Sequence, residues 1–335
     1  MNTVRSSLTG PRTGMSIHFH PLRDTDYDAL AEMFNDASLA DGIAMHQVGE
    51  EIREDFESLP VNLDAHTFGA WSGGTLVGAA YAYHVQSQER EESCYVFGAV
   101  RPSFRGRGIG RRIFGDALAA AELILRASPS DVPKFIRADA SRTNAGALRL
   151  FERAGLQPVR YFADLRRALS VSSSPVTPTG FRIVPWDASR SEETRLVKNS
   201  AFRDHWGSTP MSSEHWMTMT TGFGARPDLS YLAVSPQGSV VGFLVSHRYD
   251  NDDELLGSKY AWIRNVGTLA DWRGRGVATA LLTTALVDYH GAGMDFAALG
   301  VDSDNPTGAY RLYEMLGFLP WRQTVMYQAE LGSRD

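Results

Sequence analysis

The chain has 335 residues, which exceeds the size of one typical domain and suggests about two domains. Hydrophobic residues make up 43% and charged residues 21% of it, which is typical of globular proteins and excludes whole-chain disorder and collagen-like structure. The formal net charge of −6 argues against a nucleic-acid-binding protein held by bulk positive charge.

The cysteine content and the hydropathy pattern exclude further classes of protein. The single cysteine, Cys94, excludes an intrachain disulfide framework and a cysteine-based zinc site, and no metal-ligand spacing is recognisable among the histidines. No apolar run approaches the roughly 20 residues of a membrane span, and residues 1–14 lack the apolar segment of a secretory signal. We therefore expect a flexible tail over 1–14 and a metal-free cytoplasmic protein, a monomer or homodimer that binds neither membrane nor nucleic acid.

Three short motifs occur twice in the same order. They are 105–110 with 273–278, 147–155 with 309–317, and 76–78 with 240–242. A separation of roughly 165 residues is too long for a solenoid repeat, so it predicts two copies of one domain. We expect the copies at 15–169 and 181–333, joined by the Ser- and Pro-rich linker 170–180.

Each half shows the same order of predicted elements. In the first half we expect strand 17–20, helix 26–37, strands 76–85 and 95–100, helix 109–125, strand 135–139, helix 145–154 and a closing strand. In the second half we expect strand 181–184, helix 192–202, strands 240–247 and 262–269, helix 277–289, strand 296–301, helix 306–316 and a closing strand. The alternation predicts an α/β fold with a mixed sheet.

The repeated arginine-glycine segments have the composition of an anion site. Each lies between a predicted strand and a predicted helix, whose first turn offers unpaired N–H groups and a partial positive charge. Arginine adds bidentate contacts to phosphate. Neither segment has the Gly-Lys-Ser/Thr of a P-loop or the complete spacing of a dinucleotide fingerprint. Each half is therefore predicted to hold a phosphate or pyrophosphate.

Both segments read Arg-x-x-Gly-x-Gly/Ala, and each half later carries an Asn followed by a helix that ends in glycine. The segments are Arg105–Gly110 with 144–156 and Arg273–Ala278 with 305–318. On these residues the chain resembles a tandem member of the GNAT superfamily of acyl-CoA-dependent N-acyltransferases, over residues 15–333. Its layout is similar to that of mycothiol-synthase-like enzymes and of tandem acetyltransferases of antibiotic clusters.

The resemblance implies a mixed sheet in each half that splays where two central strands part, with acyl-CoA, most simply acetyl-CoA, in the gap. Loop amides would hold the pyrophosphate and strand ends the pantetheine. The implied residues are Gly98, Ala99, Val100, Arg105, Gly106, Arg107, Gly108, Ile109, Gly110 and Asn144 in the first half, and Val266, Gly267, Thr268, Arg273, Gly274, Arg275, Gly276, Val277, Ala278 and Asn305 in the second.

One position distinguishes the two halves. In this superfamily a tyrosine in the Leu-Tyr-x-x-x-Gly-Phe segment often serves as the general acid for the departing CoA thiolate. Tyr313 occupies that position in the second half, whereas Phe151 occupies it in the first and has no proton to give. The resemblance thus implies catalysis in the second half and acyl-CoA binding without turnover in the first.

The general base is less clear from the sequence. Mycothiol-synthase-like enzymes use a glutamate on the strand before the loop, but Tyr260–Asn265 contains no carboxylate. Asp302, Asp204 and His205 are the candidates that remain. The segment around Asp204 and His205 falls where the superfamily usually contacts the acceptor, so we expect the acceptor to enter there.

The leading hypothesis is direct transfer of an acyl group, most simply acetyl, from acyl-CoA to a primary amine of a small metabolite, within the second half. Two alternatives stay open at this point. The protein could be a non-catalytic acyl-CoA-binding scaffold or sensor, or an antibiotic-modifying acetyltransferase.

Overall fold

The computed structural model describes residues 16–43, 46–59, 61–85, 90–170, 175, 179–303 and 308–332. The predicted tail at 1–14, Asn305 and most of the linker lie outside these residues. In the described part of the chain, no helix is long and apolar enough to cross a membrane.

The first half contains six strands and five α-helices in its described residues. They are β1 (Ile17–His20), α1 (Tyr27–Ala40), α2 (Gly49–Ser58), α3 (Leu63–His66), β2 (Thr67–Ser72), β3 (Thr75–Val85), β4 (Glu92–Val100), α4 (Ile109–Ala127), β5 (Lys134–Ser141), α5 (Ala145–Arg153) and β6 (Gln157–Ala168).

The second half follows the same order except that it has no counterpart of α3 and carries an additional helix between its third and fourth strands. It contains β7 (Arg182–Pro185), α6 (Ser191–Ala201), α7 (Ser213–Thr221), β8 (Tyr231–Val234), β9 (Val240–His247), α8 (Asp252–Leu256), β10 (Tyr260–Thr268), α9 (Val277–Gly291), β11 (Phe296–Asp302), α10 (Ala309–Met315) and β12 (Leu319–Glu330). The predicted α/β class, with a mixed sheet and helices on its faces, is confirmed.

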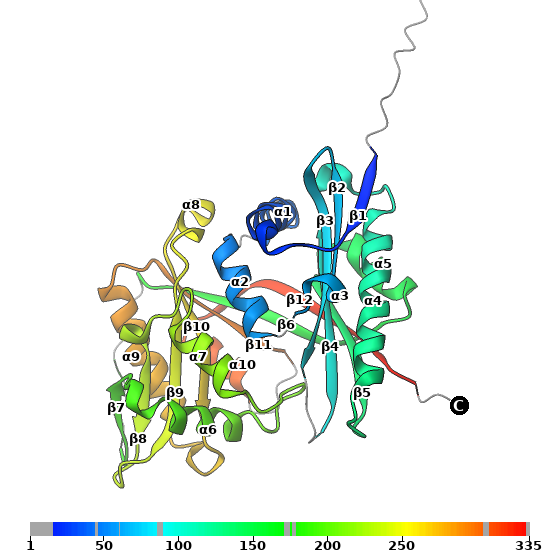
Figure 1. Cartoon of the computed structure of the whole chain (residues 1–335). Coiled ribbons are helices and arrows are strands. Elements are labelled where there is room, and N and C mark those ends of the chain that lie inside the picture. Colours follow the sequence, from blue (N-terminus) through cyan, green and yellow to red (C-terminus); the bar gives the residue numbers. More distant parts are fainter. Residues whose placement is uncertain are drawn as a thin grey trace, which may run out of the picture.

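One continuous sheet joins the two halves, and their closing strands are exchanged. The described strands follow the order β1-β2-β3-β4-β5-β12-β6-β11-β10-β9-β8-β7. β6 of the first half pairs with β11 of the second, β12 of the second pairs with β5 of the first, and β6 and β12 pair with each other. Figure 1 shows β6 and β12 running between the two lobes.

The cores follow the same exchange. Leu165 of β6 is fully buried in the core that α9 and α10 form over the second half. Val325 and Tyr327 of β12 are buried in the core that α4 and α5 form over the first half. Each half therefore depends on the other for the strand that closes its core, which the local sequence patterns did not reveal.

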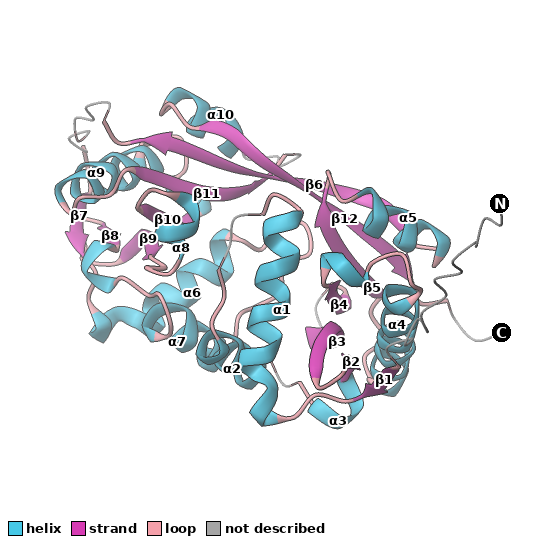
Figure 2. Cartoon of the chain, turned by 90° about the horizontal axis from the view of Figure 1, so that it is seen from above, coloured by secondary structure: helices cyan, strands magenta, loops and turns pink. Residues whose placement is uncertain are grey.

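Helices cover both faces of the sheet. In each half the helix after the arginine-glycine loop packs on one face, and the first two helices pack on the other, as the separate core clusters show. Figure 2 shows α1 and α2 near the centre of the molecule, with α2 directed toward α7. The contact between α2 and α7 places a first-half helix beside the second half.

Candidate functional site

The two arginine-glycine loops have the same backbone shape. Gly106 and Gly108 have φ values of 75° and 82°, and Gly274 and Gly276 have values of 72° and 80°. Glycine enters this left-handed region without steric cost, which explains its place in both motifs. α4 and α9 begin directly after the second glycine, so the N–H groups of their first turns face each loop.

Each loop follows a strand that parts from its parallel neighbour. β4 pairs with β5 only from Glu92 to Tyr95, and β10 pairs with β11 only from Tyr260 to Trp262. Beyond these points the facing edge of each strand has no strand partner among the described residues, which leaves N–H and C=O groups open. The predicted pantetheine-binding segments 98–100 and 266–268 lie on these open edges. Loop and strand end thus come together in both halves, as the resemblance implied.

The end of β10, beside the second gap, carries a buried polar group. Thr268 Oγ1 is buried and has no hydrogen-bond partner in the described part of the chain. Buried hydroxyls normally have one. An amide-bearing chain such as pantetheine offers both donors and acceptors, so the strand end fits it.

A one-residue bulge distinguishes β10 from β4. The register of β10 against β9 shifts between Ile263 and Asn265, which makes Arg264 an extra, unpaired residue. The ladder between β3 and β4 is continuous from Gly78 to Val85. A bulge bends its strand and re-aims the neighbouring groups. Of the two strands, only β10 has such a bulge, and it lies two residues after Trp262, the last residue of β10 that pairs with β11.

The loop arginines have different partners. Arg105 donates two hydrogen bonds to the Asp41 carboxylate, at 2.7 and 3.0 Å, and Asn144 Nδ2 donates to the same carboxylate at 2.9 Å. Arg273 instead donates to the backbone carbonyl of Ala201 at 2.8 Å. Two of the first-half residues predicted to contact acyl-CoA, Arg105 and Asn144, are therefore already bound to an internal anion.

Tyr313 and Phe151 occupy equivalent helices but differ in surroundings. Tyr313 is buried, its ring packs edge-on against Phe318 at 6.0 Å, and its hydroxyl makes no hydrogen bond with the described residues. Burial raises the pKa of Tyr313 to about 12, so the hydroxyl keeps its proton at neutral pH. Phe151 packs between Phe114 and Tyr327, at 5.0 and 5.5 Å, in an apolar cluster.

The three predicted base candidates have neighbours that limit this role. Asp302 forms an ion pair with Arg160 of β6 at 3.3 Å. His205 stacks on Phe202 at 4.5 Å, and burial together with the Arg273 charge lowers its pKa, against the opposing charges of Asp302 and Asp204. The Asp204 side chain is exposed. The structure places the three in one region, near the Arg273 loop.

The segment expected to face the acceptor also packs on the first half. Trp206 lies over the buried Arg137 guanidinium at 4.1 Å, and Arg90 donates to the backbone carbonyl of Arg203. A side chain added at Gly207 would come within 3.0 Å of Arg137. This segment therefore joins the two halves close to the second loop.

A group of charged residues that the sequence does not bring together lies between the halves. The group comprises Glu51 and Asp55 of α2, Asp252 of α8 and Arg264 of β10. The charges of the other three shift the pKa of Glu51, and the charge of Arg264 also shifts the pKa of Asp55. The spacing of Glu51 and Asp55, four residues apart in an acidic amphipathic segment, was the available signal. It did not reveal that α2 belongs beside the other half.

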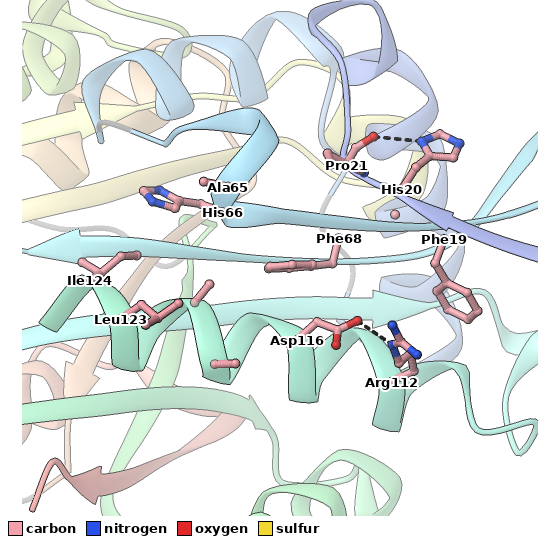
Figure 3. A pocket seen from close by; sticks show the side chains of 13 residues that line it. Phe19, His20, Pro21, Ala65, His66, Phe68, Arg112, Asp116, Leu123 and Ile124 are labelled. Atoms are coloured by element: carbon pink, nitrogen blue, oxygen red, sulfur yellow. Dashed lines mark hydrogen bonds and ion pairs between the residues drawn. The ribbon is translucent and has the colours of Figure 1, made fainter. Parts of the chain in front are cut away.

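A cavity of about 510 Å³ lies elsewhere, between β1, β2 and α4. Figure 3 shows Phe19, Phe68 and Leu123 on its walls. The charged residues in its wall are already paired, because Arg112 Nε donates to Asp116 Oδ2 at 2.7 Å. His20 Nδ1 donates to the Pro21 carbonyl at 2.9 Å. No residue of the Arg105 loop lines it. In the described part of the chain, no cluster of His, Cys, Asp and Glu is placed to hold a metal ion.

Comparison with known families agrees with this geometry. The model of the Acetyltransferase (GNAT) family matches twice, over residues 28–156 and 192–318. The chain therefore belongs to the GNAT acetyltransferase family, as a tandem member. It is an N-acetyltransferase whose donor is acetyl-CoA or another acyl-CoA.

Curated relatives cover most of the chain. The mycothiol acetyltransferase of Kocuria rhizophila is 32% identical over 272 residues, which is 78% of this chain and 83% of the relative. That of Thermobispora bispora is 31% identical over 234 residues, 68% of this chain and 74% of the relative. That of Streptomyces coelicolor is 27% identical and spans 90% of this chain and 91% of its own.

Solved structures show the same tandem arrangement. A GCN5-related N-acetyltransferase from Sphaerobacter thermophilus superposes with a TM-score of 0.73 at 25% identity, covering 95% of this chain and 97% of its own. A tandem GNAT protein from the clavulanic acid biosynthesis pathway superposes with a TM-score of 0.71 at 19% identity, covering 96% and 100%. The latter likeness shows the fold alone.

Proposed function

We propose that this protein transfers an acyl group, most simply acetyl, from acyl-CoA directly to a primary amine of a small metabolite, and that the second half performs the chemistry. The observation that carries the assignment is that only the second half has both a bulged strand beside the gap and a tyrosine hydroxyl without a hydrogen-bond partner among the described residues. Arg264 bulges β10 beside the gap, and Tyr313 offers a hydroxyl with no partner among the described residues. The first half has a continuous ladder and Phe151.

The donor site follows from the loop and the strand end. N–H groups of 273–278 and the start of α9 bind the pyrophosphate, and the open edge of 266–268 aligns the pantetheine and polarises the thioester carbonyl. The tight turn at Gly276 brings the backbone close to the phosphates. Asn305 keeps its proposed contact with the donor.

Tyr313 assists the leaving group as a hydrogen-bond donor. A thiol has an ordinary pKa of about 8.5, and burial raises the pKa of Tyr313 to about 12, so complete proton transfer from the phenol to the thiolate is uphill. A phenol that keeps its proton still stabilises the thiolate through an O–H···S bond. Asp302, Asp204 and His205 remain near the second loop, where His205 with its lowered pKa is the neutral member of the set.

The acceptor is a small molecule. Relatives named mycothiol acetyltransferases support this class. The strand glutamate of the mycothiol-synthase-like pattern is absent from Tyr260–Asn265, so mycothiol chemistry belongs in the test and is not assumed. The panel of probes is α-amino acids, amino sugars and mycothiol without its acetyl group.

The test compares two matched loop variants. Gly108→Ala and Gly276→Ala each force alanine into the left-handed region, at a cost of about 1–2 kcal/mol of stability. We expect only Gly276→Ala to raise the KM for acetyl-CoA, by tenfold or more, in assays of CoA release with the amine panel. An equal effect of both variants would overturn the assignment to the second half. Acetyl-CoA binding without amine-dependent CoA release across the panel would favour the scaffold alternative.

A further inference from the structure

A helix of the first half forms one wall beside the strand that the proposed function makes catalytic. α2 contacts α7 of the second half. The backbone N–H of Phe223 donates to Glu54 Oε2 at 2.6 Å, and the N–H of His46 donates to Asp252 Oδ1 at 2.7 Å. These two hydrogen bonds hold α2 and the segment before it against the second half.

Two carboxylates of α2 share one helix face. Glu51 is half-buried, and Asp55, four residues later, is exposed. Glu51 accepts a hydrogen bond from the backbone of Val48, but its Oε2 is buried and has no partner in the described part of the chain. The charges that act on it are Asp55 of its own helix, Asp252 of α8 and Arg264 of β10, and Tyr249 lies close enough for its own pKa to respond to Glu51. Glu51 is therefore a carboxylate with a free oxygen beside β10.

Arg264 connects this carboxylate with the reaction gap. It is the bulge residue of β10, two positions past the last pair that β10 makes with β11. It is exposed and makes no hydrogen bond or ion pair with the described residues. Its charge reaches Glu51 and Asp55 on one side and His215 and His247 on the other. The bulge thus lies between the acidic face of α2 and the second half's own helices.

Polar groups without partners also occur on the opposite wall. Lys198 of α6 is only 5% exposed, yet it makes no hydrogen bond or ion pair in the described residues, and its ammonium lies 5.7 Å from the centroid of the Phe202 ring. Among the described residues, His215 Nδ1 of α7 and Trp262 Nε1 of β10 are also buried without hydrogen-bond partners. The positive charges of Lys198 and Arg264 both lower the pKa of His215, so the two cations lie near this histidine. Buried polar groups normally find partners, so this set indicates a polar ligand between the walls.

We propose that Glu51 of the first half binds the acceptor's ammonium group at the second half's reaction gap and takes up its proton, so that the two halves build one active site. The inference rests on the proposed function. One ammonium proton passes to the Glu51 carboxylate, and the neutral nitrogen forms the C–N bond as the C–S bond breaks. The second nitrogen proton ends on the CoA sulfur. This role fills the position that the missing strand glutamate leaves open.

The electrostatic surroundings suit a base that works near neutrality. Burial, together with the charges of Asp55 and Asp252, raises the pKa of Glu51 to about 7, against the lowering effects of the Val48 hydrogen bond and of Arg264. A general base is most effective when its pKa lies near the working pH. Asp302, by contrast, has its carboxylate in the ion pair with Arg160.

The experiment replaces Glu51 by glutamine and uses the exposed Glu50→Gln on the same helix as the matched control. The probes are acetyl-CoA with the panel amine that gives the highest kcat/KM, and the aminooxy analogue of that amine, which is already neutral at pH 7. We expect Glu51→Gln to lower kcat/KM for the amine by about 100-fold and to remove the acidic limb of the pH profile near pH 7. The aminooxy probe should lose far less, and Glu50→Gln should match the wild type.

A thermal readout separates this role from a structural one. Because glutamine removes a buried charge, the Tm of Glu51→Gln at pH 8 should equal or exceed that of the wild type. Unchanged kcat/KM and an unchanged acidic limb in an active protein would overturn the role of Glu51 and leave the proposed function intact. Equal losses with both probes, or a loss that follows a lowered Tm, would also overturn it. A wild type that acetylates no amine overturns both.

Discussion

The two arginine-glycine loops share a backbone and differ in what their side chains hold. The φ values of their paired glycines agree within a few degrees. In the first loop Arg105 and Asn144 bind the Asp41 carboxylate, whereas in the second Arg273 binds a backbone carbonyl. A loop that is shaped for an anion therefore does not by itself mean that the anion is a ligand. The competing internal carboxylate decides how available the first loop is.

The strands that lead into these loops extend the comparison. β10 has a bulge at Arg264 and its half carries Tyr313, whereas β4 has a continuous ladder with β3 and its half carries Phe151 at the equivalent position. The first half instead contributes α2, whose acidic face lies beside β10. Duplication followed by divergence would leave one half with the donor site and the other with part of the acceptor wall.

The largest expected effect comes from breaking the strand exchange. A chain that ends after Phe318 lacks β12, which pairs with both β5 and β6. The first half then loses Val325 and Tyr327 from its core, so we expect both halves to lose cooperative unfolding. Circular dichroism recorded during heating measures this loss. A first half that keeps its own thermal transition without β12 would contradict this expectation.

Exchanging the aromatic residues tests which half carries the leaving-group donor. Tyr313→Phe should lower kcat by about 100-fold or more, because it removes a hydrogen bond made in the transition state. Phe151→Tyr should restore no activity and should lower stability by about 1–3 kcal/mol, because its hydroxyl would enter an apolar cluster. Steady-state CoA release and thermal melts measure both effects. Full activity of Tyr313→Phe would refute the assignment.

Releasing the first loop from its internal anion should change acyl-CoA binding. Asp41→Asn removes the charge that competes for Arg105, so we expect a second acetyl-CoA adduct in native mass spectra at concentrations where the wild type binds one. Asp36→Asn, which breaks the ion pair with Arg101, is the matched control on the same segment. The same stoichiometry in both variants would show that Asp41 does not limit binding.

The smallest expected effect concerns Lys198, a buried cation of the second half. Burial, aided by the Arg195 charge, lowers the pKa of Lys198 to about 8, so the folded state disfavours the charged form. Burying the charged lysine therefore lowers the free energy of unfolding. This effect is present in full below pH 8 and disappears as the pH rises from 8 toward the ordinary lysine pKa of about 10.4. Lys198→Met should raise the free energy of unfolding at pH 7 by about 1–3 kcal/mol. Lys259→Met, at an exposed lysine, is the control. A gain that does not shrink between pH 8 and 10 would contradict the assigned cause.

The sequence by itself determined the repeat, the order of elements and the loop chemistry. Strands 17–20 and 240–247 appear as β1 and β9 with the expected bounds, because alternation of apolar and polar residues in the first and an apolar run in the second are local signals. The Gly-rich motifs fixed the loops, because positive φ is a property of the residue itself. The contrast between Tyr313 and Phe151 was likewise readable, because it depends on one functional group in a repeated segment.

Only the tertiary structure decided which groups meet. The exchange of β6 and β12 depends on pairing between distant strands, and nothing in either strand's own pattern specifies its partner. Asp41 on Arg105 and Glu51 beside Arg264 are contacts of the same kind, between residues far apart in the chain. Local patterns report backbone preference and burial, whereas partner choice depends on how whole elements pack. The first half's share in the second half's site therefore became visible only in the folded chain.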